Sequence, residues 1–378
     1  MADMTAAHRW WTVGVVVVLL IASPVLVRAL PVADEDVSAS ALFSRLEDSR
    51  GESFAGYVET DGTVSLPENE ALSSLGDLLG ETNRMRVWWS GPDTWRVASL
   101  RTTGETDLVH RGEQMIRWVY ESKRATLIPD VPVRLPNASD LLPHQLVRLA
   151  LADVEASELS RLPARRVAGR SALGLRLTPR DEQAGIGRVD VYVDRDTGVP
   201  LQVEMFAAGG RSPSLTSRYL DFSPGAQPPE VVSFDPPPDA QRRFDDVVDL
   251  AAAADRFAAR EPPPSLAGLP ARGASASSSG GASFGGSVGV YGRGPTVLLA
   301  VPLWSRSADQ VRKSLQNQPR VQTIDQGILV EAAPLRLLLA EPEHNGTSWL
   351  LAGTVTSKAL TDAAEELTEN RPSLSGPP

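Results

Sequence analysis

The chain of 378 residues contains no cysteine, few aromatic residues and only four histidines. Without cysteine the protein can form no disulfide bond, no thiolate metal site and no cysteine nucleophile. The histidines are too few and too scattered for the usual metal clusters, so we predict no cofactor. Acidic residues outnumber basic residues by 47 to 37, which gives a net charge of −10. Nucleic acid is therefore not an expected partner, because phosphate binding needs a basic surface.

What the chain does have is one long apolar run near its N-terminus, residues 10–27 (WWTVGVVVVLLIASPVLV), without a single charge. As a helix, these 18 residues rise about 27 Å, close to the ~30 Å hydrocarbon thickness of a bilayer. The run is therefore either a membrane anchor or a secretory signal peptide. Its length and the tryptophan pair at its start favour the anchor. We predict that residues 1–36 are an anchor or signal segment, and that the rest of the chain is extracytoplasmic, either tethered to the cell membrane by this single pass or exported after cleavage.

Alternation of apolar and polar residues dominates the middle of the chain. A short amphipathic helix is predicted at 37–49, where leucines recur at helical spacing behind a serine that can cap it. Two blocks of strands follow, between residues 83 and 128 and between 165 and 222, with a helix at 139–151 between them. The strands carry charges mainly on one face, so the sheet should be solvated on one side and buried on the other.

The composition changes sharply at residues 259–295, where glycine, serine and proline predominate. Such a segment cannot bury enough apolar surface to offset its chain entropy, so we predict a linker there. The linker separates a larger domain at 37–258 from a small α+β domain at 296–370. Residues 371–378 are predicted to be a disordered tail.

Five motifs occur in order along the larger domain: F-x-G-x-V at 54–58, R-V-W-x-x-G-P-D-x-W-R-V at 86–97, G-E-x-x-x-x-W at 112–118, A-G-R-x-A-x-x-L-x-L-x-P-R at 168–180 and V-x-V-D-x-x-T-G-V-P-L-x-V-E at 191–204. Their order resembles the superfamily of the lipoprotein carrier LolA and the sigma-E regulatory protein RseB, also called MucB. The resemblance covers roughly residues 37–245, and the small domain is similar to the second domain that RseB has and LolA lacks.

This resemblance implies an open, strongly curved antiparallel half-barrel whose concave face is covered by helices. In the family, the cavity of the half-barrel takes acyl chains of a lipoprotein or lipid, and RseB also binds an anti-sigma factor. The carrier's lid-locking arginine has no counterpart that can be placed in this sequence. The fold class that we predict is therefore α+β, a LolA-like half-barrel with a helical lid and a small α+β domain, preceded by an N-terminal transmembrane helix.

Apolar and aromatic residues of one parity in each strand are the candidates for lining such a cavity. The candidate lipid-binding residues are Met85, Val87, Trp89, Trp95, Val97, Ile116, Trp118 and Tyr120. Two interpretations stay open at this point. The side chains either form an ordinary core against the helix at 140–151, or they line a trough that accepts an acyl chain, whose methylenes each contribute about 0.8 kcal/mol on burial.

The predicted function is that of a membrane-tethered, extracytoplasmic lipid- or lipoprotein-binding regulatory protein resembling RseB. Its partners would be acyl chains in the cavity and the extracytoplasmic part of an anti-sigma factor or a similar envelope protein. The alternative is a carrier resembling LolA, which shuttles lipids or lipoproteins within the envelope. No catalytic constellation stands out in the sequence, so we predict that the protein is not an enzyme.

Overall fold

The computed structural model describes residues 34–65, 73–112, 114–129, 136–244, 263–272, 288–316, 321–341 and 347–369, together with Trp11, Val13, Val15 and Val32. Most of the predicted anchor at 10–27 lies outside the described residues, as do the predicted tail at 371–378 and much of the predicted linker. Among the residues that are described, no helix is both long and apolar enough to cross a membrane. The anchor therefore stays a prediction from the sequence.

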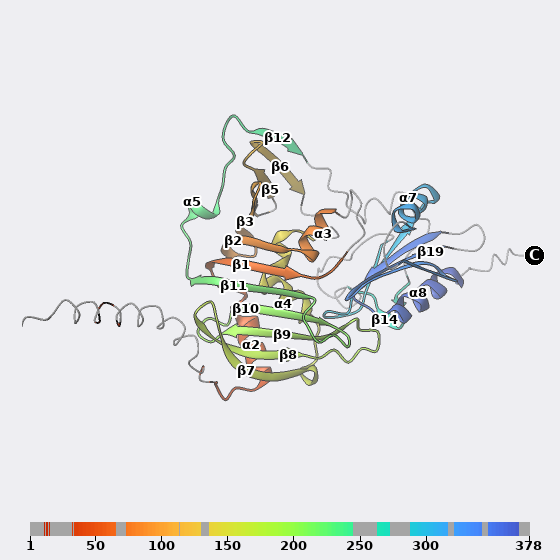
Figure 1. The fold of residues 1–378 in the computed structure, drawn as a ribbon, viewed down its shortest axis with the longest axis horizontal. Coiled ribbons are helices and arrows are strands. Elements are labelled where there is room, and N and C mark those ends of the chain that lie inside the picture. The colour runs from red at the N-terminus through yellow and green to blue at the C-terminus, as the bar shows by residue number, and fades with distance from the viewer. Residues whose placement is uncertain are drawn as a thin grey trace, which may run out of the picture.

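The larger of the two main sheets contains twelve strands within the described part of the chain (Figure 1), in the order β12-β6-β5-β4-β3-β2-β1-β11-β10-β9-β8-β7. The strands are β1 (Phe54–Gly62), β2 (Thr82–Gly91), β3 (Thr94–Arg101), β4 (Gly104–Arg111), β5 (Gln114–Val119), β6 (Arg124–Pro129), β7 (Leu159–Val167), β8 (Arg170–Leu177), β9 (Ile186–Asp194), β10 (Pro200–Ala207), β11 (Leu215–Pro224) and β12 (Gln241–Phe244). Neighbouring strands are antiparallel except β12 and β6, which are parallel. The sheet is not closed, because β7 and β12 at its two ends do not pair with each other.

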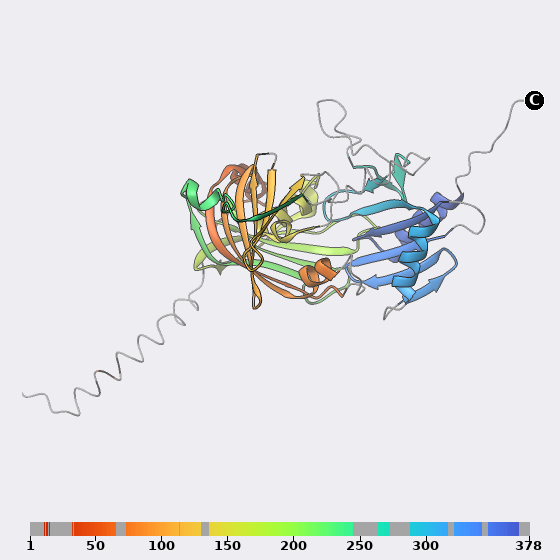
Figure 2. The same cartoon turned by 90° about the horizontal axis from the view of Figure 1, so that it is seen from above.

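Figure 2 shows that this sheet is strongly curved. Its inner face packs against α2 (Ala39–Asp48), η1 (Ser49–Gly51), η2 (Ala138–Leu141) and α4 (Pro143–Ala150). The remaining short helices of this part of the chain are α3 (Ser73–Gly80), η3 (Ala156–Glu158) and α5 (Pro229–Val232). The α+β class and the open, mostly-sheet architecture predicted from the sequence are confirmed.

Local sequence explains where α2 begins. The side chain of Ser38 accepts a hydrogen bond from the backbone N–H of Ala41 at 3.1 Å, which satisfies one of the free donors at the helix start. Leu42 and Leu46, one turn apart, are buried against the inner face of the sheet. The helix predicted at 37–49 is therefore confirmed as α2.

The turn between β9 and β10 is locked by one buried carboxylate. Asp194 is fully buried and accepts hydrogen bonds from Arg170 at 2.7 and 2.9 Å and from the Thr197 hydroxyl at 2.8 Å. Gly198 closes the turn with a φ of +77°, and a Cβ on it would stand 2.6 Å from the carbonyl oxygen of Arg45 in α2. The turn therefore needs glycine both for its backbone conformation and for its contact with α2.

Replacing Gly198 with alanine should lower the free energy of unfolding by about 2–3 kcal/mol, because left-handed backbone strain and the clash with α2 add together. Urea unfolding of the full chain measures this loss. Gly169→Ala is the matched control: its φ is +76°, but a Cβ there meets nothing within 4 Å. The control should lose only about 1 kcal/mol. Equal losses in the two variants would show that the contact with α2 contributes nothing.

The smaller sheet has six strands in the order β15-β16-β20-β19-β18-β17 within the described residues. They are β15 (Gly289–Tyr291), β16 (Leu298–Leu303), β17 (Val321–Ile324), β18 (Gly327–Ala332), β19 (Leu335–Ala340) and β20 (Ser348–Gly353), accompanied by α7 (Ser305–Gln316) and α8 (Ser357–Glu369). Leu329 and Leu338 pack with α8, whereas Ile328 and Leu339 pack with α7. Alternate residues thus face opposite layers, and the sheet lies between the two helices.

Part of the predicted linker at 259–295 belongs to this small domain. Residues 263–272 contain a hairpin of β13 (Ser265–Leu266) and β14 (Leu269–Pro270), and β15 follows after a stretch outside the described residues. Leu266, Leu269 and Tyr291 are almost completely buried in the cluster formed with α8. The linker prediction is wrong for these residues, because a few well-spaced apolar side chains supply enough burial to order a glycine- and proline-rich segment.

Apolar contacts join the two domains at α3, in the insertion between β1 and β2. Leu75 of α3 and Val64 after β1 pack in the same cluster as Ile328 and Leu339 of the small domain. Leu78, one turn from Leu75, lies instead in the core of the larger domain. One short helix therefore contributes a leucine to each of two hydrophobic cores.

Polar contacts join the domains a second time. The backbone N–H of Gly185 donates to the carbonyl of Thr354 at 2.8 Å, and that of Thr356 donates to Gln183 at 2.8 Å. Arg293 binds Glu158 through two hydrogen bonds of 2.6 and 3.0 Å. These contacts hold the small domain against the ends of the strands and loops of the larger domain.

Candidate functional site

A row of stacked aromatic rings runs across the inner face of the larger sheet. Trp89 lies between Trp95 and Phe54, with ring centroids 5.9 and 6.2 Å away and nearly parallel planes. His110 stacks on the far side of Trp95 at 5.2 Å. The cross-strand register explains the row, since Trp89 pairs with Trp95 and also with Phe54, and Trp95 pairs with His110.

Five of the eight predicted lining residues share this inner face. Met85, Val87 and Val97 are almost completely buried in the core, and Trp89 and Trp95 are nearly so. The helices α2 and α4 fill most of the space above them. Among the described residues, the core interpretation therefore holds for most of the inner face.

The other three predicted residues, Ile116, Trp118 and Tyr120, belong to the opposite face. Trp118 pairs with Asp107 on β4, whereas Met115 of the same strand lies in the inner core and pairs with His110. On the outer face Trp118 contacts Tyr120, with ring centroids 5.7 Å apart, and Phe234 at 5.4 Å. The prediction that all eight residues line one trough is wrong for these three.

The outer face carries a buried charge under the segment that contains α5. Asp107 is completely buried and accepts hydrogen bonds from Arg96 at 2.9 Å and from the Tyr120 hydroxyl at 3.2 Å. Arg96 also donates to the carbonyl of Val231 in α5 at 3.1 Å. Burial raises the pKa of Asp107, and Arg96 opposes that rise. The Asp107–Arg96 pair therefore holds the segment that contains α5 against the outer face of the sheet.

A cavity of about 270 Å³ lies on the inner side, at the end of the half-barrel formed by the start of β1, the end of β2 and the start of β10. It is lined by Leu46, Glu47, Ser49, Arg50, Phe54, Trp89, Pro92, His144, Gln145, Arg148, Val199 and Pro200. Of the predicted lining residues, Trp89 is the one that reaches it. Its wall is apolar where it meets the core and charged at the rim, where Arg50 and Arg148 are exposed.

His144 of α4 is a polar side chain of this wall that contacts its aromatic rings. Its ring lies edge-on to Trp89, with centroids 4.3 Å apart, and to Phe54 at 5.2 Å. Burial, together with the smaller effect of the nearby Arg148 charge, lowers the pKa of His144 to about 3. The imidazole is therefore neutral across neutral and mildly acidic pH.

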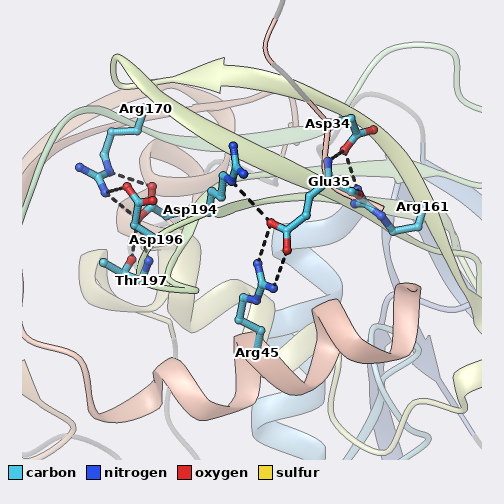
Figure 3. A network of polar contacts seen from close by, with 9 residues as sticks. Asp34, Glu35, Arg45, Arg161, Arg170, Asp194, Asp196 and Thr197 are labelled. Carbon is cyan, nitrogen blue, oxygen red and sulfur yellow. Dashed lines mark hydrogen bonds and ion pairs between the residues drawn. The ribbon is translucent and has the colours of Figure 1, made fainter. Parts of the chain in front are cut away.

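A polar recess of about 420 Å³ adjoins this end of the half-barrel, and Ser49 lines both it and the cavity. Figure 3 shows the network around it. Glu35 binds Arg45 at 3.0 Å, and Asp34 binds Arg161 of β7 at 2.7 Å. The segment that leads to the predicted anchor is thus held against α2 and β7. Among the described residues there is no group of histidines and carboxylates arranged to hold a metal ion.

The chain is similar in structure to MucB. The crystal structure of MucB in complex with MucA(peri) covers 86% of this chain and 97% of that chain, at 19% identity and a TM-score of 0.46. The MucA/MucB complex from Pseudomonas aeruginosa matches at 18% identity and a TM-score of 0.46, over 86% of this chain and 96% of that chain. The resemblance predicted from the sequence is confirmed.

A LolA-superfamily protein from Nitrosomonas europaea matches at 13% identity and a TM-score of 0.23, over 53% of this chain and 99% of that chain. No protein-family model matches the sequence. No curated protein matches it either. At such identities and TM-scores the likeness concerns the fold, and it gives no information on ligand or partner.

Sequence reasoning missed most of the cavity wall. Phe54, His144 and Val199 come from three segments far apart in the chain, and only the curvature of the sheet brings them together. The motif F-x-G-x-V contained Phe54, but nothing in it indicated which way the ring points. His110 stacks on Trp95 and His144 contacts Trp89, so the stacked tryptophan pair lies between these two histidines.

Proposed function

We propose that the protein is a membrane-tethered, extracytoplasmic regulatory protein that binds an acyl chain in the cavity between Phe54, Trp89 and His144. The supporting observation is the cavity itself, which has aromatic and aliphatic walls inside and charges at the rim. An apolar cavity of about 150 Å³ accommodates a benzene ring. A cavity of about 270 Å³ therefore suits part of one alkyl chain, which is less than the trough expected from the sequence. The proposal assigns binding to this site and no reaction.

The energetics of such binding are adequate. Each buried methylene contributes about 0.8 kcal/mol, so six of them contribute about 5 kcal/mol before the cost of ordering the ligand. This corresponds to weak, reversible binding. Reversibility suits a protein that reports on the amount of a lipid or lipoprotein in the envelope.

The partner that we propose is the extracytoplasmic part of an anti-sigma factor or a similar envelope protein. MucB has been solved in complex with MucA(peri), and we extend an association of that kind to this chain as part of the proposal. Ligand in the cavity would favour one arrangement of the chain and so change its affinity for the partner. Residues 10–27 would keep the protein at the membrane in which that partner is embedded.

Replacing Gln145 with tryptophan should abolish acyl-chain binding, because residue 145 is half-buried at the rim and a large ring there fills the entrance. The measurement is fluorescence titration of the full chain with a dansyl-labelled tetradecyl probe that has an uncharged head. We expect the affinity to fall at least tenfold.

Leu149→Trp is the matched control, since Leu149 is exposed on the same helix and does not line the cavity. The control should bind the probe as the unmodified chain does. Unchanged affinity in Gln145→Trp, with the fold intact by circular dichroism, would contradict the proposed function.

A further inference from the structure

His144 presents a hydrogen-bond donor that no described residue uses. Its Nδ1 lies 3.5 Å from the hydroxyl oxygen of Tyr219, and its Nε2 is shielded from solvent without a partner among the described residues. The phenol of Tyr219 is buried, so its proton needs an acceptor, and Nδ1 is the acceptor beside it. A neutral imidazole that accepts at Nδ1 carries its own proton on Nε2. His144 therefore lines the cavity, and its Nε2–H, which is shielded from solvent, has no acceptor among the described residues.

Arg148 places a cation close to that donor. It lies one helical turn after His144 in α4, lines the same cavity and is exposed at the rim. No described residue forms an ion pair or hydrogen bond with it. Arg50, on the other side of the rim, is different because it forms an ion pair with Glu47. The rim therefore has a positive charge on the α4 side that is available to a ligand.

Most of the apolar residues of the wall are almost completely buried, whereas the arginines at its rim are exposed. Below Arg148 and His144 lie Phe54, Trp89 and Val199, each of them almost completely buried. A ligand that matches this wall has an apolar chain at one end and an acidic, hydrogen-bond-accepting head at the other. The volume of about 270 Å³ admits one chain and not several.

The position of the rim also bears on where such a ligand comes from. Asp34, which is bound to Arg161, comes seven positions after Val27, the end of the predicted anchor. Extended chain of this length spans at most about 25 Å. With residues 10–27 in a bilayer, the end of the half-barrel that carries both the recess and the cavity stays close to the membrane surface.

The geometry points to an anionic, single-chain amphiphile from the membrane as the ligand, with its chain against Phe54 and Trp89 and its acidic head on His144 Nε2 and Arg148. This inference rests on the proposed function, because it names the chemistry of the ligand in the same cavity. The head is a carboxylate or a phosphate, since both accept from an N–H and pair with a guanidinium. A hydrogen bond to a charged head inside a shielded site adds both affinity and selectivity.

The test compares ligands with the same chain and different heads. The full chain, held in amphipol, is titrated calorimetrically with myristate, myristoyl-lysophosphatidylglycerol and tetradecanol. We expect one or both anionic ligands to bind at least tenfold more tightly than tetradecanol, and the tighter of the two identifies the head. Arg148→Gln should remove most of this preference by weakening binding of the anionic ligands at least fivefold, whereas Arg211→Gln, at an exposed position that does not line the cavity, should retain the preference.

The role of the His144 donor is tested with a double variant, so that the buried hydroxyl of Tyr219 does not lose its hydrogen-bond acceptor. The double variant His144→Phe, Tyr219→Phe keeps the ring contacts and removes the donor, so it should bind the anionic ligands at least tenfold less tightly, while Tyr219→Phe alone should change binding less than threefold. Equal affinities of the unmodified chain for all three ligands, unaffected by Arg148→Gln, would overturn the anionic head site and leave the proposed function standing. Absence of binding by all three would overturn the proposed function itself.

Discussion

Replacing Arg293 with methionine is expected to lower the free energy of unfolding by about 3 kcal/mol, because it leaves Glu158 as a buried charge without its cationic partner. The Glu158 side chain is 1% exposed, and Arg293 contacts it at 2.6 Å. Burial raises the pKa of Glu158, but Arg293 and the backbone N–H groups of Glu155 and Arg180 outweigh this effect and leave the pKa lowered. Urea unfolding at pH 7 measures the loss.

The stability lost in Arg293→Met should depend on pH. In the unmodified chain the lowered pKa of Glu158 means that its stabilising contribution is present above the unfolded value, near 4.5, and is lost as the pH falls below it. Without Arg293 the pKa of Glu158 should rise, so the folded variant binds a proton more readily than the unfolded chain and gains stability as the pH falls. The difference between the two proteins should therefore shrink between pH 7 and pH 4.

Two further variants control for other causes. Glu158→Gln combined with Arg293→Met removes the unpaired charge and should recover part of the loss. Arg211→Met replaces an exposed arginine for which the described residues provide no ion pair, and it should change stability by less than about 0.5 kcal/mol. A loss in Arg293→Met that is independent of pH would contradict the role assigned to Glu158.

The second large effect is expected on the outer face of the half-barrel. Replacing Arg96 with methionine should cost about 3–5 kcal/mol, because Asp107 is completely buried and Arg96 is its charge partner. The same change removes the hydrogen bond to Val231, which lies at 3.1 Å, so α5 should also separate from the sheet. Hydrogen exchange of residues 229–235 reports this release, and urea unfolding reports the overall loss.

Burial raises the pKa of Asp107, and loss of Arg96 should raise it further. A folded-state pKa above the unfolded value means that stability falls as the pH rises through that range. The Arg96→Met variant should therefore be less impaired at pH 5 than at pH 7.5. Arg84→Met is the control on the same face, since the Arg84–Glu59 pair has an exposed arginine and should contribute less than about 1 kcal/mol. Equal losses for the two variants would show that burial of Asp107 does not matter.

Periodicity and turn chemistry predicted the elements that carry a strong local signal. The helix α2 had a capping serine and regularly spaced leucines, and the hairpin at Asp194–Gly198 had the residues that its turn requires. The prediction of a linker failed for the segment from Leu266 to Leu269, because the burial of this segment depends on α8, almost a hundred residues away. Local composition contains no information on such a contact.

The candidate site was predicted less well, because alternation along a strand does not show which face of the sheet is the inner one. Alternation shows that Ile116 and Trp118 share a face, but only pairing with β4 shows that this is the outer face. Trp89 lies on the inner side, where it pairs with Phe54 and Trp95. The position of His144 depends on how α4 crosses the curved sheet, and no pattern within α4 specifies that crossing.

The leucines of α3 have a practical consequence for anyone who wishes to cut the chain into pieces. Leu75 packs with the small domain and Leu78 with the larger one. A truncation between the domains would therefore expose apolar surface to solvent on both fragments. Each fragment would then be prone to aggregate. Expression of residues 34–369 as one piece avoids that exposure.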